Sequence, residues 1–148
     1  MPKFNPIKSL LFVGVQFAAL GAIAATGPLW PSNPILLAVE LIGLALGVWA
    51  VLAMRIGNFN IAPDPFSWTK IVTSGPYGLI RHPMYLSLLV LTLPLIVEQF
   101  DVLRLIFWLV LLIDLVLKLN FEESLLVARL PGYKEYRGQS YRLIPFVY

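Results

Sequence analysis

The segment TSGPYGLIRHPMYL, residues 73–86, combines a turn, a basic pair and a proline suited to start a helix. Pro83 fits the first helical turn, because its missing N–H would have no partner there. We therefore expect His82 near the N-terminal end of a helix and Tyr85 about one turn further on, both facing one cavity. Each residue alone also has an ordinary explanation, with Arg81 as a membrane anchor, Tyr85 as an interfacial aromatic and His82 as a helix cap.

A second polar segment, FEESLLVARLPGYKEYRGQSYRLIPF, fills residues 121–146 directly after an apolar run. The adjacent acids Glu122 and Glu123 are unusual at that place, because acidic groups near hydrocarbon must be solvated or partnered. A solvated helix end explains the pair most simply, whereas a ligand site would use the carboxylates as acceptors for ammonium or hydroxyl groups. The tyrosines and arginines that follow are compatible with a membrane-surface belt as well as with a site.

The composition of the chain is that of an integral membrane protein. Of its 148 residues 59% are hydrophobic and only 13% are charged, well below the roughly 25% charged residues of an average soluble domain. The formal net charge of +3 comes from basic residues that lie between apolar runs, so we do not expect nucleic acid as a partner. The chain has no cysteine and a single histidine, His82, which argues against a metal site.

The apolar runs predict an all-α, polytopic membrane protein with about four transmembrane helices. A helix needs about 20 mostly apolar residues to cross the hydrocarbon core. Runs of about this size cover residues Ile7–Thr26, Pro34–Met54, Pro83–Glu98 and Val102–Leu119. We expect one domain, residues 1–148, with a cytoplasmic loop at residues 55–82 and a cytoplasmic C-terminal tail.

Two features of these runs predict how they pack and how they are oriented. Gly43 with Gly47 and Gly14 with Ala18 form small-xxx-small pairs, which are typical of closely packed membrane helices. The lysines and arginines lie before the first run, between the second and third, and after the fourth, with Arg104 as the exception. The positive-inside rule then places both termini in the cytoplasm, with the chain in the inner (cytoplasmic) membrane.

The two polar segments together resemble the isoprenylcysteine carboxyl methyltransferase family and its relatives, the phospholipid N-methyltransferases. The resemblance covers roughly residues 57–145 and is carried by RHPMY, by EESLL and by the ending GYKEYRGQSYRLIP, in this order relative to the apolar runs. It implies a membrane enzyme that binds S-adenosylmethionine at the cytoplasmic face, under cover of the tail. The implied reaction is methyl transfer to a lipophilic or small acceptor.

The resemblance also implies roles for individual residues. The implied cofactor contacts are His82, Tyr85, Glu122, Glu123 and Tyr133. His82 is also an implied catalytic residue, together with Arg81 and Arg142, which are implied either to orient the substrate or to brace the two acids. A carboxylate and an aromatic face suit a ligand that carries both an amino acid end and a sulfonium, which agrees with these assignments.

The acceptor is open between two chemistries. A carboxylate acceptor, such as an isoprenylcysteine, is already ionised near neutral pH and would be held by an arginine fork at Arg81 or Arg142. An amine acceptor, such as that of a phospholipid, needs a base, for which His82 or one of the glutamates is nearest. Four runs are fewer than in the larger isoprenylcysteine enzymes, which puts that substrate in question. Membrane lipids are the expected partners in either case.

Two other functions compete with methyl transfer. A small four-helix membrane transporter of cationic compounds would use Glu40 or Asp114 as its coupling acid and would gather its polar groups at the bilayer midplane. The sequence gathers them in the loop and the tail instead, and Asp114 is expected to pair with Lys118 one turn later. A noncatalytic anchoring protein would leave RHPMY and EESLL without a role.

Overall fold

The computed structural model describes residues 5–54 and 70–147 and is all-helical over these ranges. Residues 55–69, which make up much of the predicted cytoplasmic loop, lie outside the described residues, and nothing here bears on their predicted role. The described elements follow in chain order: α1 Pro6–Ala25, α2 Pro34–Met54, the 3-10 helix η1 Gly75–Gly78, α3 Pro83–Glu98, α4 Val102–Arg129 and α5 Tyr133–Gln139.

The helix boundaries have local chemical causes. Asn5 caps α1, because its side chain accepts a hydrogen bond from the backbone N–H of Lys8 at 3.1 Å, and a proline occupies the first turn. Asp101 caps α4 in the same way, with its carboxylate 2.8 Å from the N–H of Leu103. The predicted start of α3 at Pro83 is confirmed.

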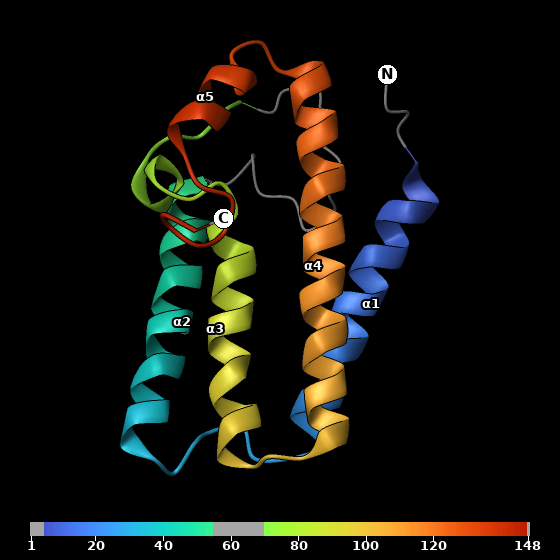
Figure 1. Ribbon diagram of the computed structural model, residues 1–148, viewed down its shortest axis with the longest axis vertical. Helices are drawn as coiled ribbons and strands as arrows, with labels where there is room; N and C mark the ends of the chain where they lie inside the picture. Colours follow the sequence, from blue (N-terminus) through green and yellow to red (C-terminus); the bar gives the residue numbers. More distant parts are fainter. Residues whose placement is uncertain (1–4, 55–69, 148) are drawn as a thin grey trace.

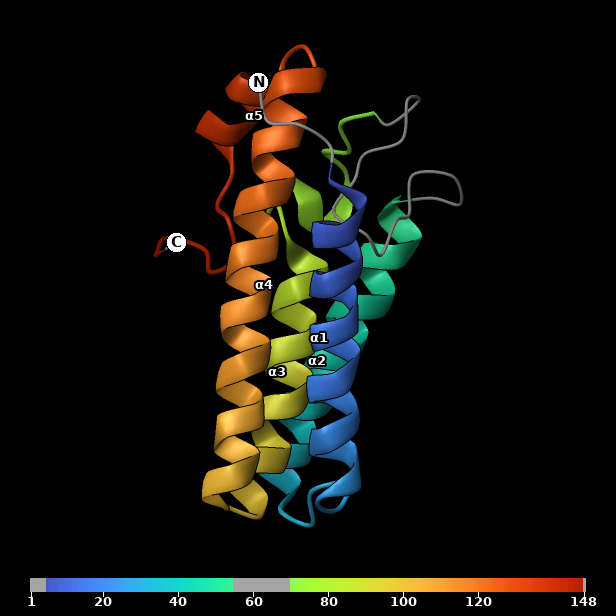
Figure 2. The same ribbon diagram turned by 90° about the vertical axis from the view of Figure 1, so that its right-hand side faces the viewer.

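Four long helices run side by side and form one bundle (Figures 1 and 2). The first two helices connect at the lower end of the bundle, as do α3 and α4, whereas α5 and η1 lie at the upper end. Pairwise, α2 packs on α3 and α1 packs on α4, and the two pairs meet through α3 and α4. The core between them is apolar, with Ile23, Leu111 and Leu115 almost fully buried.

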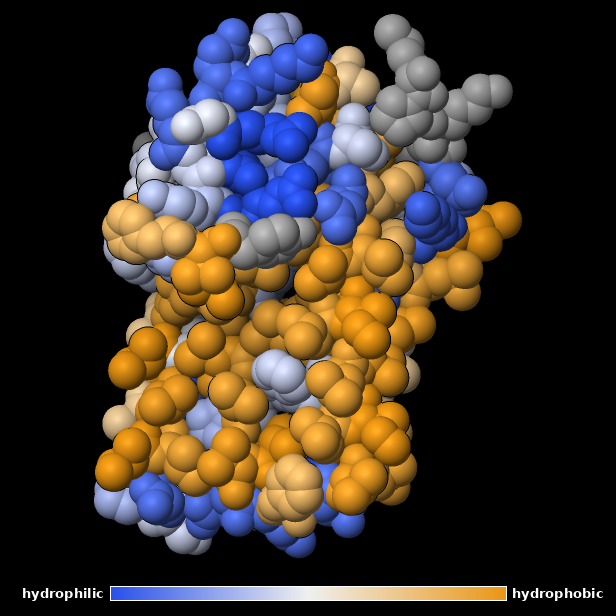
Figure 3. Space-filling view, in the orientation of Figure 1, coloured by the Kyte–Doolittle hydropathy of each residue, from blue (hydrophilic) through white to orange (hydrophobic). Residues whose placement is uncertain are grey.

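The surface of the bundle is apolar where a bilayer would cover it. Figure 3 shows a broad hydrophobic band over the body of the bundle, with hydrophilic residues at the end that carries α5 and along the opposite rim. Large apolar side chains such as Leu10, Leu52 and Ile113 are exposed to the surroundings of the bundle. An exposed apolar surface of this extent is typical of a membrane-embedded protein.

The helices differ in how well they meet the requirements of a membrane span. Within the described residues α1 and α2 are long and apolar enough to cross a membrane, and their bounds agree with the predicted runs to within one residue. α3 is apolar but has only 16 residues, which corresponds to a length of about 24 Å. α4 has 28 residues and continues past its apolar part into the polar end. The predicted count of four spans therefore remains a prediction.

Candidate functional site

The C-terminal tail is hydrogen-bonded to the chain just before α3, so that the two polar segments of the sequence meet. The backbone N–H of Arg81 donates to the carbonyl of Tyr141 at 2.7 Å, and that of His82 donates to the carbonyl of Arg142 at 3.1 Å. In return, the N–H of Tyr141 donates to the carbonyl of Leu79 at 2.9 Å. These bonds hold the tail against the N-terminal end of α3.

His82 is the N-terminal cap residue of α3, but its side chain does not cap the helix. No hydrogen bond joins the imidazole to the backbone of the first turn. The ring instead stacks on the ring of Tyr85, with the centroids 5.2 Å apart and the planes inclined by 9°. This is the one-turn relationship expected from the sequence, and it leaves the imidazole nitrogens directed at other groups.

Glu123 is buried and surrounded by cations. Its Oε1 lies 2.7 Å from Nε of Arg81 and 3.4 Å from Nε2 of His82, and its Oε2 lies 3.3 Å from Nε of Arg142 and 3.6 Å from Nε of Arg137. Burial alone would raise the pKa of Glu123, but hydrogen bonds and positive charge from His82 and Arg81 lower this pKa to about 2. Glu123 is therefore ionised and compensated, and it is not a solvated helix end.

Arg81 joins three parts of the fold. Besides Glu123 on α4, its Nη1 donates to the backbone carbonyl of Arg137 at 3.0 Å, to the backbone carbonyl of Ser140, and to the Ser140 hydroxyl at 3.3 Å. A guanidinium holds several acceptors in a fixed geometry, so this single side chain sets the position of α5 relative to α3 and α4. Nε and Nη1 of Arg81 are thus engaged within the protein and have little remaining capacity to donate hydrogen bonds to a ligand.

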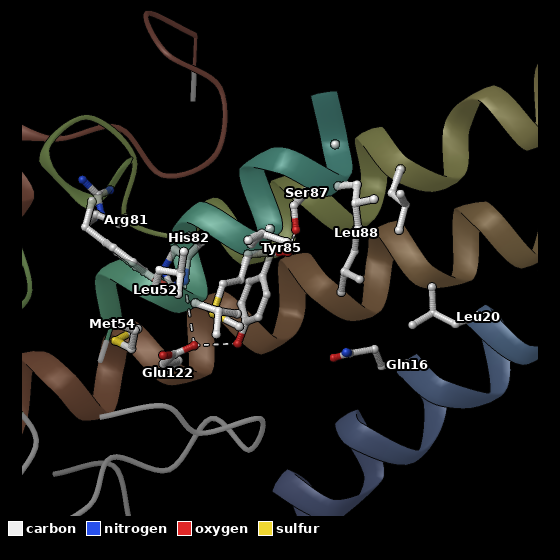
Figure 4. A pocket seen from close by; sticks show the side chains of 18 of the residues that line it. Gln16, Leu20, Leu52, Met54, Arg81, His82, Tyr85, Ser87, Leu88 and Glu122 are labelled. Carbon is white, nitrogen blue, oxygen red and sulfur yellow. Dashed lines mark hydrogen bonds and ion pairs between the residues drawn. The ribbon is translucent and has the colours of Figure 1, made fainter. Parts of the chain in front are cut away.

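Glu122 has different partners from its neighbour. The hydroxyl of Tyr85 donates to Oε2 of Glu122 at 2.6 Å, and Nδ1 of His82 lies 3.8 Å from the same oxygen (Figure 4). Within the described residues no arginine or lysine forms an ion pair with Glu122, whose side chain is 27% exposed. This carboxylate consequently keeps acceptor capacity for a ligand.

An apolar pocket of about 500 Å³ opens beside these groups. Its walls are formed by α1, α2 and α3, with Glu122 contributed by α4, and Figure 4 shows Arg81, His82, Tyr85 and Glu122 toward one end. Within the pocket wall the backbones of α2 and α3 approach each other closely at Gly43, where an added Cβ would lie 2.6 Å from the backbone nitrogen of Leu91. The pocket is large enough for part of a lipid-like ligand.

The residues named from the sequence fall into two groups. Those that line the pocket are Arg81, His82, Tyr85 and Glu122. The described lining of the pocket does not include the other three, Glu123, Arg142 and Tyr133. Tyr133 is 4% exposed at the start of α5, and its ring packs edge-on against that of Tyr136 with the centroids 5.7 Å apart.

Tyr77 and Gln16 are polar pocket residues that the sequence analysis did not single out. Tyr77 of η1 lines the pocket, and its hydroxyl is buried without a hydrogen-bond partner in the described part of the chain. Burial, with the nearby charge of Glu122, raises the pKa of Tyr77, so that this hydroxyl stays protonated and can donate. Gln16 of α1 also lines the pocket. The sequence signal that could have found Gln16 is its polar amide inside an otherwise apolar run.

The predicted pair of Asp114 and Lys118 is not formed as an ion pair in the described structure. Nζ of Lys118 instead donates to Oε1 of Gln16 at 2.7 Å and lies 5.2 Å from the centroid of the Tyr85 ring. Oδ2 of Asp114 is buried and has no hydrogen-bond partner among residues 5–54 and 70–147. The cause is the packing of α1 on α4, which brings an amide oxygen closer to the lysine than its neighbour one turn away.

A comparison with models of known protein families matches residues 34–130 to the family described as phospholipid methyltransferase. The match covers about two thirds of the chain, from the start of α2 to the end of α4, and includes both RHPMY and EESLL. The resemblance drawn from these motifs is thereby confirmed. A search among curated proteins found no match to the chain.

Proposed function

The chain belongs to the phospholipid methyltransferase family, and on this premise we propose that it transfers a methyl group from S-adenosylmethionine to the amine of a membrane lipid. Members of this family are membrane-associated methyltransferases that act on phospholipid-like substrates, which supports an enzyme function for the chain. The donor and the amine acceptor are our proposal.

The observation that carries the proposal is the carboxylate of Glu122 at the polar end of an apolar pocket. Its Oε2 is fixed by the Tyr85 hydroxyl at 2.6 Å, and no arginine neutralises it in the described residues. Such a group binds a cation, and the apolar walls accept a hydrocarbon chain. A lipid with a cationic head therefore matches both parts of the pocket.

The same charges distinguish between the two acceptor chemistries. A carboxylate acceptor would need an arginine fork, but Arg81 and Arg142 both form ion pairs with Glu123. Releasing either one would leave the Glu123 carboxylate buried without its full set of counter-charges, which is strongly unfavourable. An amine acceptor needs no arginine, and the geometry supports it better.

The residues at the polar end also fit the proposed methyl donor. Tyr77 lines the pocket and its buried hydroxyl has no hydrogen-bond partner among the described residues, while Glu122 can accept hydrogen bonds from ammonium or hydroxyl groups. Tyr77, His82 and Glu122 are accordingly the residues that we propose to hold the donor. When bound, S-adenosylmethionine supplies a methyl group activated by a sulfonium.

The protein's own part in the reaction is positioning and proton transfer. An ammonium must lose a proton before its nitrogen can accept a methyl group, and Nδ1 of His82 with the carboxylate of Glu122 can receive that proton. The apolar walls exclude water from the reacting atoms, and alignment of the acceptor accounts for most of the rate gain in such a site. No covalent intermediate with the enzyme is required.

The orientation that we propose places the site at the cytoplasmic face, with both chain termini on that side. Apart from Arg104, the basic residues of the sequence lie before or in the first turn of α1, between α2 and α3, and from Lys118 of α4 onward. Figures 1 and 2 support one common side, since α5 and the start of α1 lie at the same end of the bundle.

Two measurements test the proposal. Detergent-solubilised protein is titrated calorimetrically with S-adenosylhomocysteine, the demethylated donor, and is then incubated with labelled S-adenosylmethionine and phosphatidylethanolamine. We expect binding, labelled lipid, and loss of both in His82→Ala, while Lys134→Ala on the exposed side of α5 keeps them. Absence of any binding response at millimolar ligand, with folded protein, would contradict the proposal.

A further inference from the structure

Lys118 is a buried cation whose only described hydrogen bond goes to a neutral amide. It lies on α4, is 1% exposed, and donates from Nζ to Oε1 of Gln16 at 2.7 Å. No ion pair joins it to the acids one turn away on either side, Asp114 and Glu122, in the described structure. Both acids are near enough to attract the Lys118 ammonium, but neither forms an ion pair with it in the described residues, so its charge is only partly compensated.

This lysine determines which way the amide of Gln16 points. An ammonium group can only donate, so the amide must turn its oxygen toward Lys118 and its NH₂ group elsewhere. Gln16 is buried and lines the pocket, and within the described chain its amide nitrogen forms no hydrogen bond. The pocket therefore contains a hydrogen-bond donor, the amide NH₂ of Gln16, on a side chain whose amide oxygen contacts the Lys118 ammonium.

The donor lies deeper in the bundle than the carboxylate of Glu122. Lys118 precedes Glu122 by four residues on α4, which corresponds to about 6 Å along the helix axis. Figure 4 shows Gln16 and Leu20 on α1, farther along the pocket than the group formed by His82, Tyr85 and Glu122. The pocket thus has an acceptor end at Glu122 and, roughly one helical turn deeper, a donor at Gln16.

We propose that Gln16, oriented by Lys118, determines acceptor specificity by binding a phosphate oxygen of the lipid whose amine contacts Glu122. The inference rests on the proposed function and adds a second recognition point to it. A phosphate suits this position because the Lys118 ammonium favours an anion over a neutral oxygen. In the head of an aminophospholipid, the phosphate lies deeper in the membrane than the amine, in the same order as Gln16 and Glu122.

The arrangement also accounts for the charged side chain of Lys118 inside an apolar bundle. The Lys118 ammonium is stabilised partly by the Tyr85 ring, 5.2 Å from its Nζ, and by the amide oxygen of Gln16. Neither partner carries a full negative charge. An anion bound at Gln16 supplies that charge next to the pair, so that ligand binding and compensation of Lys118 occur together.

The test compares two lipid probes that share a cationic head but differ in the phosphate. Dioleoylphosphatidylethanolamine and oleylamine are each bound to detergent-solubilised full-length protein, and their dissociation constants are measured by native mass spectrometry without any methyl donor. We expect Gln16→Leu to weaken binding of the phospholipid about tenfold and to leave oleylamine within about twofold. Phe17→Leu, which alters an apolar residue of the same wall, should affect both probes equally.

A second variant addresses the possibility that Gln16→Leu does not fold, because it leaves Lys118 without a hydrogen-bond partner. Gln16→Glu gives Lys118 a carboxylate partner, so the helices should stay together, but it removes the donor and repels phosphate. We expect a selective loss of phospholipid binding at least as large as in Gln16→Leu. Equal weakening of both probes in Gln16→Glu, or no weakening, would overturn the assignment.

The probes separate this inference from the methyl-transfer proposal. If Gln16→Glu discriminates between the lipids while wild-type protein transfers no methyl group, the recognition of phosphate stands and the proposed reaction falls. If the wild type methylates the phospholipid but the variant binds both probes as the wild type does, the reaction stands and the role of Gln16 falls.

Discussion

Glu122 and Glu123 are adjacent in sequence but have opposite electrostatic surroundings. The carboxylate of Glu123 is 3% exposed and lies within 3.6 Å of guanidinium nitrogens from three arginines. The carboxylate of Glu122 accepts from the Tyr85 hydroxyl and borders the pocket. Successive residues of a helix point about 100° apart, so one carboxylate can hold the tail to the bundle while the next faces a ligand.

Replacement of either acid by glutamine should separate these two roles. We expect Glu122→Gln to weaken binding of S-adenosylhomocysteine at least tenfold, because a charge-assisted hydrogen bond contributes roughly 1.5–3 kcal/mol, and to leave the melting temperature nearly unchanged. Glu123→Gln should instead lower the melting temperature, because it leaves buried cations without their counter-charge, at a cost of about 3–5 kcal/mol. Calorimetric titration and thermal unfolding measure the two effects, and Glu135→Gln on the exposed side of α5 is the control.

The stability of the fold should depend on pH through Glu123. In the folded protein its pKa is about 2, below the ordinary value of 4.5, so its stabilising effect is complete above pH 4.5 and is lost as pH falls toward 2. The corresponding free energy is on the order of 3 kcal/mol. Thermal unfolding of wild type and Glu123→Gln at pH 7 and pH 3 should show a difference that shrinks at the lower pH. A difference independent of pH would contradict the ion-paired state of Glu123.

The parts of the site that follow from local rules could be predicted from the sequence. Pro83 determines where α3 begins, and helical spacing then brings the rings of His82 and Tyr85 together. The contact between Gln16 and Lys118 is different, since 102 positions separate the two residues and only the packing of α1 on α4 joins them. Asp114 was the more obvious partner for Lys118 on local grounds, which is why that pair was expected.

Tyr77 shows another limit of prediction from sequence. It lies in a turn sequence, GPYG, that is typical of a simple loop. Its burial depends on Tyr136 of α5, whose hydroxyl donates to the backbone carbonyl of Tyr77 at 2.6 Å. A tail residue 59 positions away thus holds Tyr77 against the pocket, and no local pattern records this contact.

The proposed orientation can be tested by labelling, because the chain contains no cysteine of its own. Leu29→Cys introduces an exposed thiol in the connection between α1 and α2, and Lys134→Cys introduces one in α5. With the site in the cytoplasm, a membrane-impermeant maleimide should label Cys at position 29 in intact cells and Cys at position 134 only after permeabilisation. The reverse pattern would invert the topology.

The close approach of α2 and α3 should make Gly43 intolerant of any side chain. A Cβ at this position would lie 2.6 Å from the nitrogen and 2.9 Å from the Cα of Leu91, which are backbone atoms that cannot move without displacing α3. We expect Gly43→Ala to destabilise the fold by about 1–3 kcal/mol, the usual range for overpacking. Because His82 directly precedes α3 as its N-terminal cap residue, the displacement should also weaken ligand binding.

Gly14→Ala provides the matched control for this variant. It makes the same substitution in a neighbouring apolar helix, but an added Cβ at Gly14 would meet no atom within 4 Å. Its melting temperature should equal or slightly exceed that of the wild type, since alanine favours a helix over glycine by about 1 kcal/mol. Equal melting temperatures for the two variants would show that α2 and α3 do not approach each other at Gly43 as closely as described.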